Sequence, residues 1–180
     1  KRLAILQQQL AALQIKKSRI AWLRFATVAA IVAGTYFLWS FGWIYVVSTV
    51  VVLMVVFTRL VFADINNSKN ITHTKHLTGI NEDELKALAH NYYHFENGNE
   101  FIDPKHYYAN DLDIFGKASL YQYINRTTSQ MGGSTLAQWL LNPADTATIY
   151  QRQTAVKELA TKPEYRQQLQ ALGKEKKIQT

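Results

Sequence analysis

Two long apolar runs dominate the pattern of the first third of the chain. One extends from Ile20 to Trp39 and the other from Trp43 to Ala63, and each contains a single charged residue. A helix rises 1.5 Å per residue, so twenty residues cover about 30 Å, the thickness of a bilayer's hydrocarbon core. Only Ser40-Phe41-Gly42 separates the runs. The pattern therefore predicts a tight antiparallel transmembrane hairpin over residues 20–63.

Aromatic and basic residues at the two ends of this hairpin fit membrane interfaces. Trp39 and Trp43 flank the turn and Trp22 lies near the opposite end, where interfacial tryptophans are common. Arg24 and Arg59 lie close enough to the shared open end for their charged groups to extend into the interface.

Charge asymmetry predicts the orientation of the hairpin. The turn is uncharged and the open end is basic, so the positive-inside rule predicts a multi-pass protein of the cytoplasmic (inner) membrane with both termini in the cytoplasm. One alternative is a buried helical pair in a soluble core. A cleaved signal peptide is disfavoured, because two runs occur and no small-residue cleavage site follows the first.

The residues that precede the hairpin predict an amphipathic helix. Leu3, Leu6, Leu10 and Leu13 alternate spacings of three and four, which is typical of a coiled-coil seam. We interpret residues 1–19 as a cytoplasmic helix that either packs within its own protein or dimerises, which leaves a homodimer possible.

Residues 64–110 are polar and mixed, and we interpret them as a connector with one short helix. Asn81-Glu82-Asp83-Glu84 predicts the start of that helix, with Asn81 as its cap. Asn97-Gly98-Asn99 predicts a turn. The rest of the connector should be irregular chain whose aromatic residues pack against the following helices.

Residues 111–180 predict a module of four short helices. The first helix covers Lys117–Thr127, with Gln122, Asn125 and Arg126 facing water. The second is capped by Ser134 or Thr135, after a break at Met131-Gly132-Gly133, and ends at Asn142-Pro143. The third is capped by Asp145 or Thr146, and the fourth begins at Pro163 and ends at Gly173. The predicted fold class is all-α, a transmembrane hairpin followed by a small helical module.

Several motifs follow one another at defined spacing in this module. They are Ser119-Leu120, Ile124-Asn125-Arg126-Thr127, Met131-Gly132, Leu136, Trp139-Leu140-Leu141-Asn142-Pro143 and Ile149-x-x-Arg152-Gln153-x-Ala155-Val156-x-Glu158-Leu159. In this order the module resembles the core, or lever, region of the MutS mismatch-repair family. The resemblance implies a non-catalytic scaffold that joins DNA-embracing clamp helices to a nucleotide-binding domain further along the chain. We expect structural roles for Arg126, Gly132, Trp139, Pro143 and Arg152.

The sequence departs from the family pattern at several points. Ser134 stands where the family usually has arginine, and Ala137 and Gln138 occupy positions that are often basic, so these positions lack the basic side chains that would contact phosphate. Phe95-Glu96-Asn97 does not fit the spacing of the mismatch-reading Phe-x-Glu element. Gly132-Gly133-Ser134-Thr135 lacks the lysine of a phosphate loop. We therefore expect no ATP hydrolysis and no cofactor in this stretch.

Composition adds two limits on function. The chain has no cysteine, which excludes disulfides, thiol catalysis and cysteine-bound zinc. The net charge of +7 arises entirely in residues 1–63, because residues 64–110 and 111–180 carry −3 and +3. DNA binding by the soluble part alone should therefore be weak. A chain that starts at Lys1 and stops at Thr180 after a basic run suggests a piece of a longer protein.

All five histidines fall within residues 64–110, which raises the question of a metal site. His90 and His94 would share one face of a helix, His73 and His76 are three apart, and Asp103, His106, Asp111 and Asp113 could add ligands. No His-Glu-x-x-His pattern occurs. We interpret the histidines as surface and capping residues and expect no metal.

The leading hypothesis is the membrane-anchoring and lever segment of a MutS-like protein. This segment is not itself an enzyme, but the full-length protein would be an ATPase that binds ATP and Mg²⁺ in a later domain. The resemblance also implies ATP-dependent, mismatched DNA binding in DNA mismatch repair or a related transaction, so the expected partners are the lipid bilayer and DNA. The alternatives are a membrane-bound helical interaction scaffold without a nucleic-acid role and a membrane hydrolase that uses the histidines and aspartates.

Overall fold

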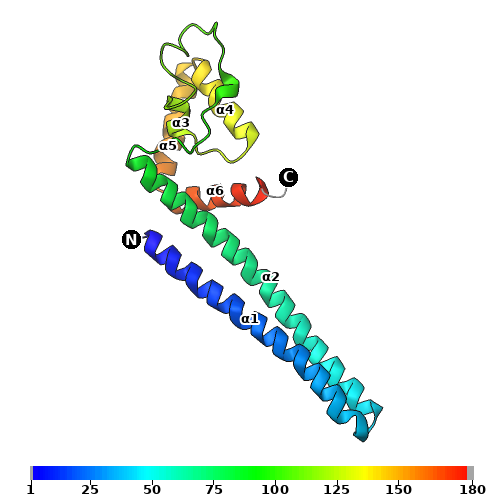
Figure 1. The fold of residues 1–180 in the computed structure, drawn as a ribbon. Coiled ribbons are helices and arrows are strands. Elements are labelled where there is room, and N and C mark those ends of the chain that lie inside the picture. The colour runs from blue at the N-terminus through cyan, green and yellow to red at the C-terminus, as the bar shows by residue number, and fades with distance from the viewer. Residues whose placement is uncertain (1, 178–180) are drawn as a thin grey trace. The chain divides into compact units, whose positions relative to one another are not determined.

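The computed structural model describes residues 2–177, and all regular structure in that range is helical (Figure 1). The elements are α1 (Arg2–Leu38), η1 (Trp39–Phe41), α2 (Trp43–Leu88), η2 (Asn99–Phe101), α3 (Leu120–Ile124), α4 (Gln130–Leu141), α5 (Thr146–Ala160) and α6 (Pro163–Lys177). The predicted all-α class is confirmed. The chain divides into two compact units between Lys75 and His76, and α2 contributes residues to both.

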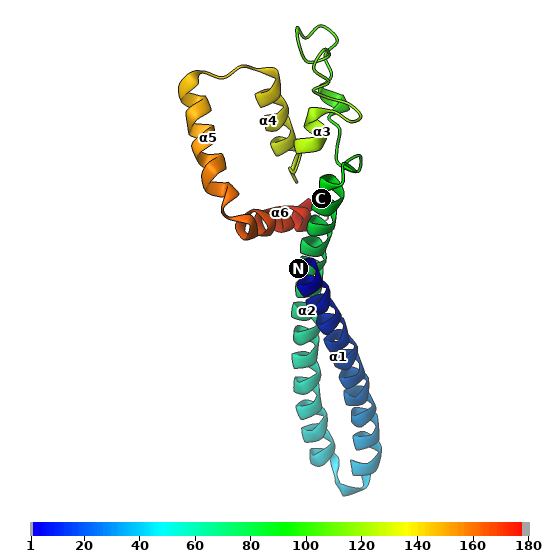
Figure 2. The same ribbon diagram turned by 90° about the vertical axis from the view of Figure 1, so that its left-hand side faces the viewer.

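The first unit is an antiparallel hairpin in which α1 and α2 run side by side from the η1 turn (Figure 2). A set of its less exposed residues recurs at alternating spacings of three and four, with Lys17 as the exposed exception. On α1 they are Leu3, Leu6, Leu10, Leu13, Ile20, Arg24, Thr27, Ile31, Gly34 and Leu38; on α2 they are Val46, Val50, Leu53, Phe57, Leu60, Asp64, Asn67, Ile71 and Thr74. This is the periodicity of a two-helix seam.

The N-terminal leucines of α1 lie in the seam with α2. Asn67 is 2% exposed and its Nδ2 donates a hydrogen bond to the carbonyl oxygen of Leu13 at 3.0 Å. Leu6 is 7% exposed in the same seam. The N-terminal half of α1 therefore packs within its own protein, against the part of α2 that follows the second apolar run.

The predicted short helix at Asn81 is wrong in its start, because α2 continues without a break from Trp43 to Leu88. Asn81 lies inside it, and its Nδ2 donates to the Leu77 carbonyl at 2.7 Å. The buried residues Ile71, Leu77 and Ile80 give the polar stretch an apolar face. Burial of that face keeps the chain helical, so the capping pattern is overridden by packing.

The second unit has a small core of residues drawn from several elements. Tyr121, Ala137 and Ala171 are 1%, 1% and 0% exposed, and the Tyr121 hydroxyl donates to the Gly133 carbonyl at 3.3 Å. Burial, and to a lesser extent Glu100 and Glu96, raise the pKa of Tyr121. The phenol therefore stays protonated at neutral pH and continues to donate its hydrogen bond to the Gly133 carbonyl of α4.

The predicted bounds of the first two helices of the module need correction. The first was expected over residues 117–127, but α3 is limited to Leu120–Ile124, because Ser119 caps it in an extended conformation and Asn125 leaves the helix. The second begins at Gln130, with Ser129 as its cap instead of Ser134 or Thr135.

The glycines in this region lie inside helices, and close contacts explain them. A Cβ on Gly133 would lie 3.0 Å from the Tyr121 hydroxyl, and one on Gly173 would lie 2.0 Å from Oγ1 of Thr128. The prediction that Gly173 ends the last helix is wrong, since α6 passes through it to Lys177. The expected cap at Asp145 and the expected start at Pro163 are confirmed.

Candidate functional site

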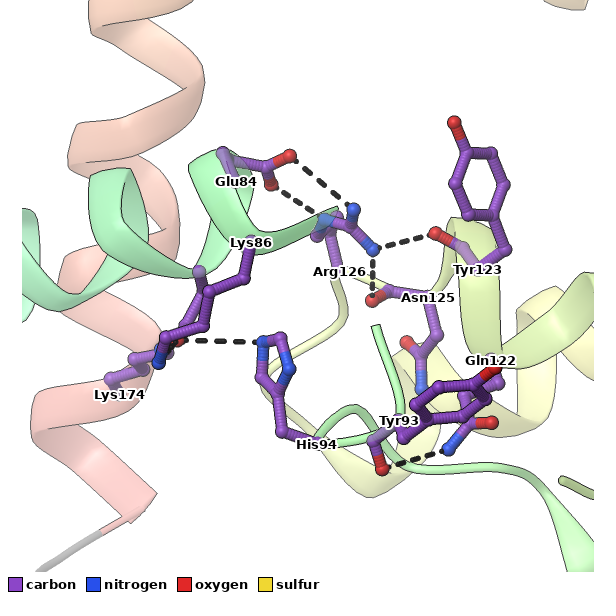
Figure 3. Close-up of polar contacts among 10 residues, drawn as sticks. Glu84, Lys86, Tyr93, His94, Gln122, Tyr123, Asn125, Arg126 and Lys174 are labelled. Carbon is purple, nitrogen blue, oxygen red and sulfur yellow. Dashed lines mark hydrogen bonds and ion pairs between the residues drawn. The ribbon is translucent and has the colours of Figure 1, made fainter. Parts of the chain in front are cut away.

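The last turns of α2 hold a set of charged residues that meets later parts of the chain. We call Asp83, Glu84, His94, Arg126 and Lys174 the polar junction (Figure 3). All five belong to the second unit. The acids come from α2, and the bases come from the chain after α2, from the chain just after α3 and from α6. The junction thus joins α2 to the helices that follow it.

Arg126 is held by several groups at once. Its Nε and Nη2 donate to the two carboxylate oxygens of Glu84 at 2.5 and 3.3 Å (Figure 3). Its Nη1 donates to the carbonyls of Tyr123 and Asn125 at 2.8 and 3.0 Å, and the guanidinium lies 3.9 Å from the centre of the Phe95 ring. A forked, stacked arrangement of this kind suits arginine and not lysine. All three nitrogens are already used within the protein.

Asp83 accepts from three directions. Nζ of Lys86, Nε2 of His94 and Nζ of Lys174 lie 3.4, 3.4 and 3.7 Å from its carboxylate. The contact of His94 is an ion pair only when the imidazole is protonated. Pairs of such partly exposed groups contribute little free energy individually, about 0–1 kcal/mol each. Of the three contacts, the one with Lys174 joins α6 to α2.

A second polar contact fixes the same two helices. The side-chain amides of Asn81 on α2 and Gln167 on α6 exchange hydrogen bonds of 3.3 and 3.1 Å. Ala171 of α6 is fully buried next to the close approach of Gly173 and Thr128. The paired amides therefore position α6 on α2, and Gly173 permits close packing of α6 against Thr128.

A groove of about 730 Å³ lies between these elements in the second unit. Its lining includes Ile80, Arg126, Thr127, Thr128, Ser129 and Arg166. The Ser129 hydroxyl accepts from the Gly132 amide at 3.1 Å, so the start of α4 is capped by its own chain. The groove combines apolar walls with hydroxyl groups, and Arg126 forms part of its wall while each of its three nitrogens donates within the protein.

Gln122 is a buried polar residue that the sequence reasoning misplaced. We expected it to face water, but it is 3% exposed. Its Nε2 donates to the carbonyls of Tyr93 and Phe95 at 3.1 and 2.8 Å, and its Oε1 accepts from the Ala118 amide at 2.8 Å. Asn125 and Arg126, also expected to face water, are buried and half-buried. These side chains form hydrogen bonds with backbone groups outside the helices, and such contacts produce no periodic pattern in the sequence.

His106 and Tyr108 cap the end of α4. Nε2 of His106 lies 3.1 Å from the Leu141 carbonyl, and the Tyr108 hydroxyl donates to the Leu140 carbonyl at 2.6 Å. The Ala109 amide donates to Nδ1 of His106 at 3.2 Å, so Nε2 carries the hydrogen in the neutral ring. Loss of hydration, and secondarily Tyr107, raise the pKa of Tyr108. Neither ring nitrogen of His106 is left for a metal.

The other histidines do not assemble a metal site in the described part of the chain. His90 follows the end of α2 and has a φ of 59°, so the expected helix face shared with His94 is wrong. His94 instead reaches Asp83. Within residues 2–177 no three histidine or acidic side chains are grouped as metal ligands.

The five residues with predicted structural roles are spread along the segment and do not form one site. Arg126 and Gly132 line the groove. The Arg152 guanidinium lies 4.0 Å from the centre of the Trp139 indole, which links α5 to α4. Pro143 lies between these helices, one residue after the Asn142 cap.

Comparison with known families decides what this segment is. Residues 106–177 match the family described as MutS domain III. Residues 106–177 are a MutS domain III segment. The match begins at His106 and includes α3 to α6, and domain III is the non-catalytic core, or lever, of the family. No curated protein and no solved structure gives a significant match to the chain. The relation to MutS is therefore shown for the lever segment.

Proposed function

We propose that this chain anchors a MutS-like protein in the cytoplasmic membrane and carries its lever segment. The observation that supports the anchor is the exposure of the apolar hairpin. α1 and α2 are both long and apolar enough to cross a membrane, and their most apolar windows are only 11% and 0% buried. A core helix of a soluble protein would be mostly buried, so these side chains call for a lipid environment.

The exposure of the tryptophans supports their proposed role as interface anchors. Trp22, Trp39 and Trp43 are 70%, 76% and 74% exposed, and they occur at the two ends of the apolar hairpin. Nη1 of Arg24 donates to Oδ2 of Asp64 at 3.0 Å, so this arginine would reach the interface as part of an ion pair. Arg59 is exposed. We assign the open end of the hairpin to the cytoplasmic face, where basic residues accumulate.

The relation to MutS supports a role with DNA. Mismatch repair, or a related transaction that uses ATP, is the activity we propose for the full-length protein, with ATP and Mg²⁺ bound in a separate domain. In that protein the MutS domain III would transmit motion, and the polar junction would couple the movement of α6 to α2. We propose structural roles in this lever for Arg126, Gly132, Trp139, Pro143 and Arg152.

Alkaline carbonate extraction of cell membranes tests the anchor. The chain should stay with the membrane pellet, because its hairpin exposes apolar side chains that only lipid can cover. A matched variant that places glutamates at Val47, Val51 and Val55, all about half exposed or more, should be released. Release of the unaltered chain into the soluble fraction would remove the anchoring proposal.

DNA binding by this chain alone should be weak and insensitive to base sequence. Residues 64–180 carry no net charge, so few counterions would be released from DNA. Titration of fluorescent duplex DNA with the detergent-solubilised chain at several salt concentrations measures this. Tight binding with a steep salt dependence that maps to residues 64–180 would contradict the expectation.

A membrane-bound interaction scaffold is the second candidate. Val156 on α5 and Leu169 and Leu172 on α6 are 65%, 61% and 51% exposed, which favours a protein partner on these helices. The full-length gene separates the two candidates. A Gly-x-x-x-x-Gly-Lys-Ser/Thr loop between a strand and a helix supports the MutS-like proposal, and its absence supports the scaffold.

A further inference from the structure

Two arginines lie at similar height on the hairpin but have different surroundings. Arg24 on α1 pairs with Asp64 at 3.0 Å, and its guanidinium lies 5.6 Å from the centre of the Phe57 ring. Arg59 lies between Phe57 and Asp64 on α2. It is therefore near the level of the Arg24 charge, although it extends from the other helix.

Arg59 faces away from the partner helix. Phe57 belongs to the seam, and two residues advance a helix by about 200°, which places Arg59 on the outer surface. Its side chain is exposed, and the described residues provide it with no ion pair, hydrogen bond or aromatic partner. Asp64 is the only acid among residues 1–75, and Arg24 already occupies it. The hairpin itself thus offers Arg59 no counter-ion.

An apolar groove begins next to this arginine. It has a volume of about 680 Å³ and is lined by Arg59 together with Val50, Val51, Met54, Val55, Thr58 and Phe62. The lining runs from Val50 to Phe62 on α2, twelve residue steps or about 18 Å along the helix. A narrow apolar strip with one cation near its polar end has the chemistry of a phospholipid site: a chain along the strip and a phosphate at the guanidinium.

We infer that this groove binds an anionic phospholipid, with Arg59 on its phosphate and one acyl chain against Val51 and Met54. The inference rests on the proposed membrane anchoring. Charge selects the anionic class, since residues 1–75 contain nine lysines and arginines and one aspartate. Lys16, Lys17 and Arg19 are exposed near the same open end and would attract anionic headgroups.

Quenching by brominated lipids tests the site in the full chain. Because the chain has no cysteine, Met54→Cys carries a single bimane label in the groove, and Val32→Cys carries it on the exposed face of α1. Both proteins are placed in phosphatidylcholine vesicles that contain brominated phosphatidylglycerol or brominated phosphatidylcholine. At residue 54 we expect phosphatidylglycerol to bind about fivefold more strongly, as one lysine or arginine near the surface provides.

Variants separate a specific site from general attraction. Arg59→Gln should reduce the preference at residue 54 to about one, whereas Arg59→Lys should retain most of it. Lys17→Gln removes the same charge outside the groove and should lower the preference at residue 54 much less than Arg59→Gln does. Equal quenching by both lipids, no effect of Arg59→Gln, or an equal loss with Lys17→Gln would overturn the lipid site alone. If neither residue 54 nor residue 32 is quenched by any brominated lipid, the membrane anchor is overturned as well.

Discussion

At the scale of single residues, Arg126 makes a strong prediction. Arg126→Lys keeps the charge but loses the fork to Glu84 and the stacking on Phe95, so residues 120–126 should open more easily. We expect a loss of about 1–3 kcal/mol in local opening free energy, measured by hydrogen exchange of the solubilised chain. Arg166→Lys, at an exposed groove position, is the control and should change little. Equal protection in both variants would contradict the assigned contacts.

Gly173 makes a second prediction at this scale, because a side chain there has no space. Gly173→Ala would place Cβ 2.0 Å from Oγ1 and 2.9 Å from Cβ of Thr128, so α6 must shift. The thermal midpoint should fall, since overpacking costs about 1–3 kcal/mol. Gly79→Ala is the matched control inside α2, where no atom lies within 4 Å of the new Cβ, and it should be neutral or stabilising. A stabilising Gly173→Ala would show that α6 does not lie against Thr128.

At the scale of elements, Asp145 links the start of α5 to pH. Its carboxylate accepts from the amide and the hydroxyl of Thr148 at 3.0 and 2.7 Å, and these bonds lower its pKa from 3.8. A lowered folded pKa means that the stabilisation is present above pH 3.8 and is lost as pH falls through the folded value. Asp145→Asn caps the helix without titrating.

The difference in thermal midpoint between the native chain and Asp145→Asn should therefore be constant near neutral pH and move in favour of the variant in acid. Thermal unfolding followed by circular dichroism from pH 7 to pH 3 measures it. A difference that stays constant over this range would show that the Asp145 carboxylate does not cap α5 in its charged form.

The elements also show what the sequence can predict. The apolar runs predicted the hairpin, and Asp145 and Pro163 predicted two helix starts, because each is a local signal. The continuation of α2 beyond Ala63 was missed, since Asn67 and Thr74 occupy seam positions where a pattern search expects apolar residues. Gln122 and Arg126 were misplaced for a related reason, because their partners are irregular backbone and a distant glutamate.

At the scale of the whole molecule, the chain joins a hairpin of two long apolar helices to a MutS domain III segment. α2 belongs to both, because its first half lies in the apolar hairpin and its last turns carry Asp83 and Glu84 of the polar junction. The local sequence of residues 64–88 does not predict that one helix contributes to both the hairpin and the polar junction. The account therefore depends on the hairpin lying in a bilayer with the MutS segment on its cytoplasmic side.

Single-cysteine labelling in cells tests that claim most directly. The chain has no cysteine, so Ser40→Cys in the hairpin turn and Thr154→Cys on α5, both exposed, each provide one reactive site. A membrane-impermeant maleimide should label residue 40 in cells with a permeabilised outer layer and an intact inner membrane, and residue 154 only after that membrane is broken. Labelling of residue 154 while the inner membrane is intact would contradict the account. So would recovery of the protein in the soluble fraction with neither residue labelled in intact cells.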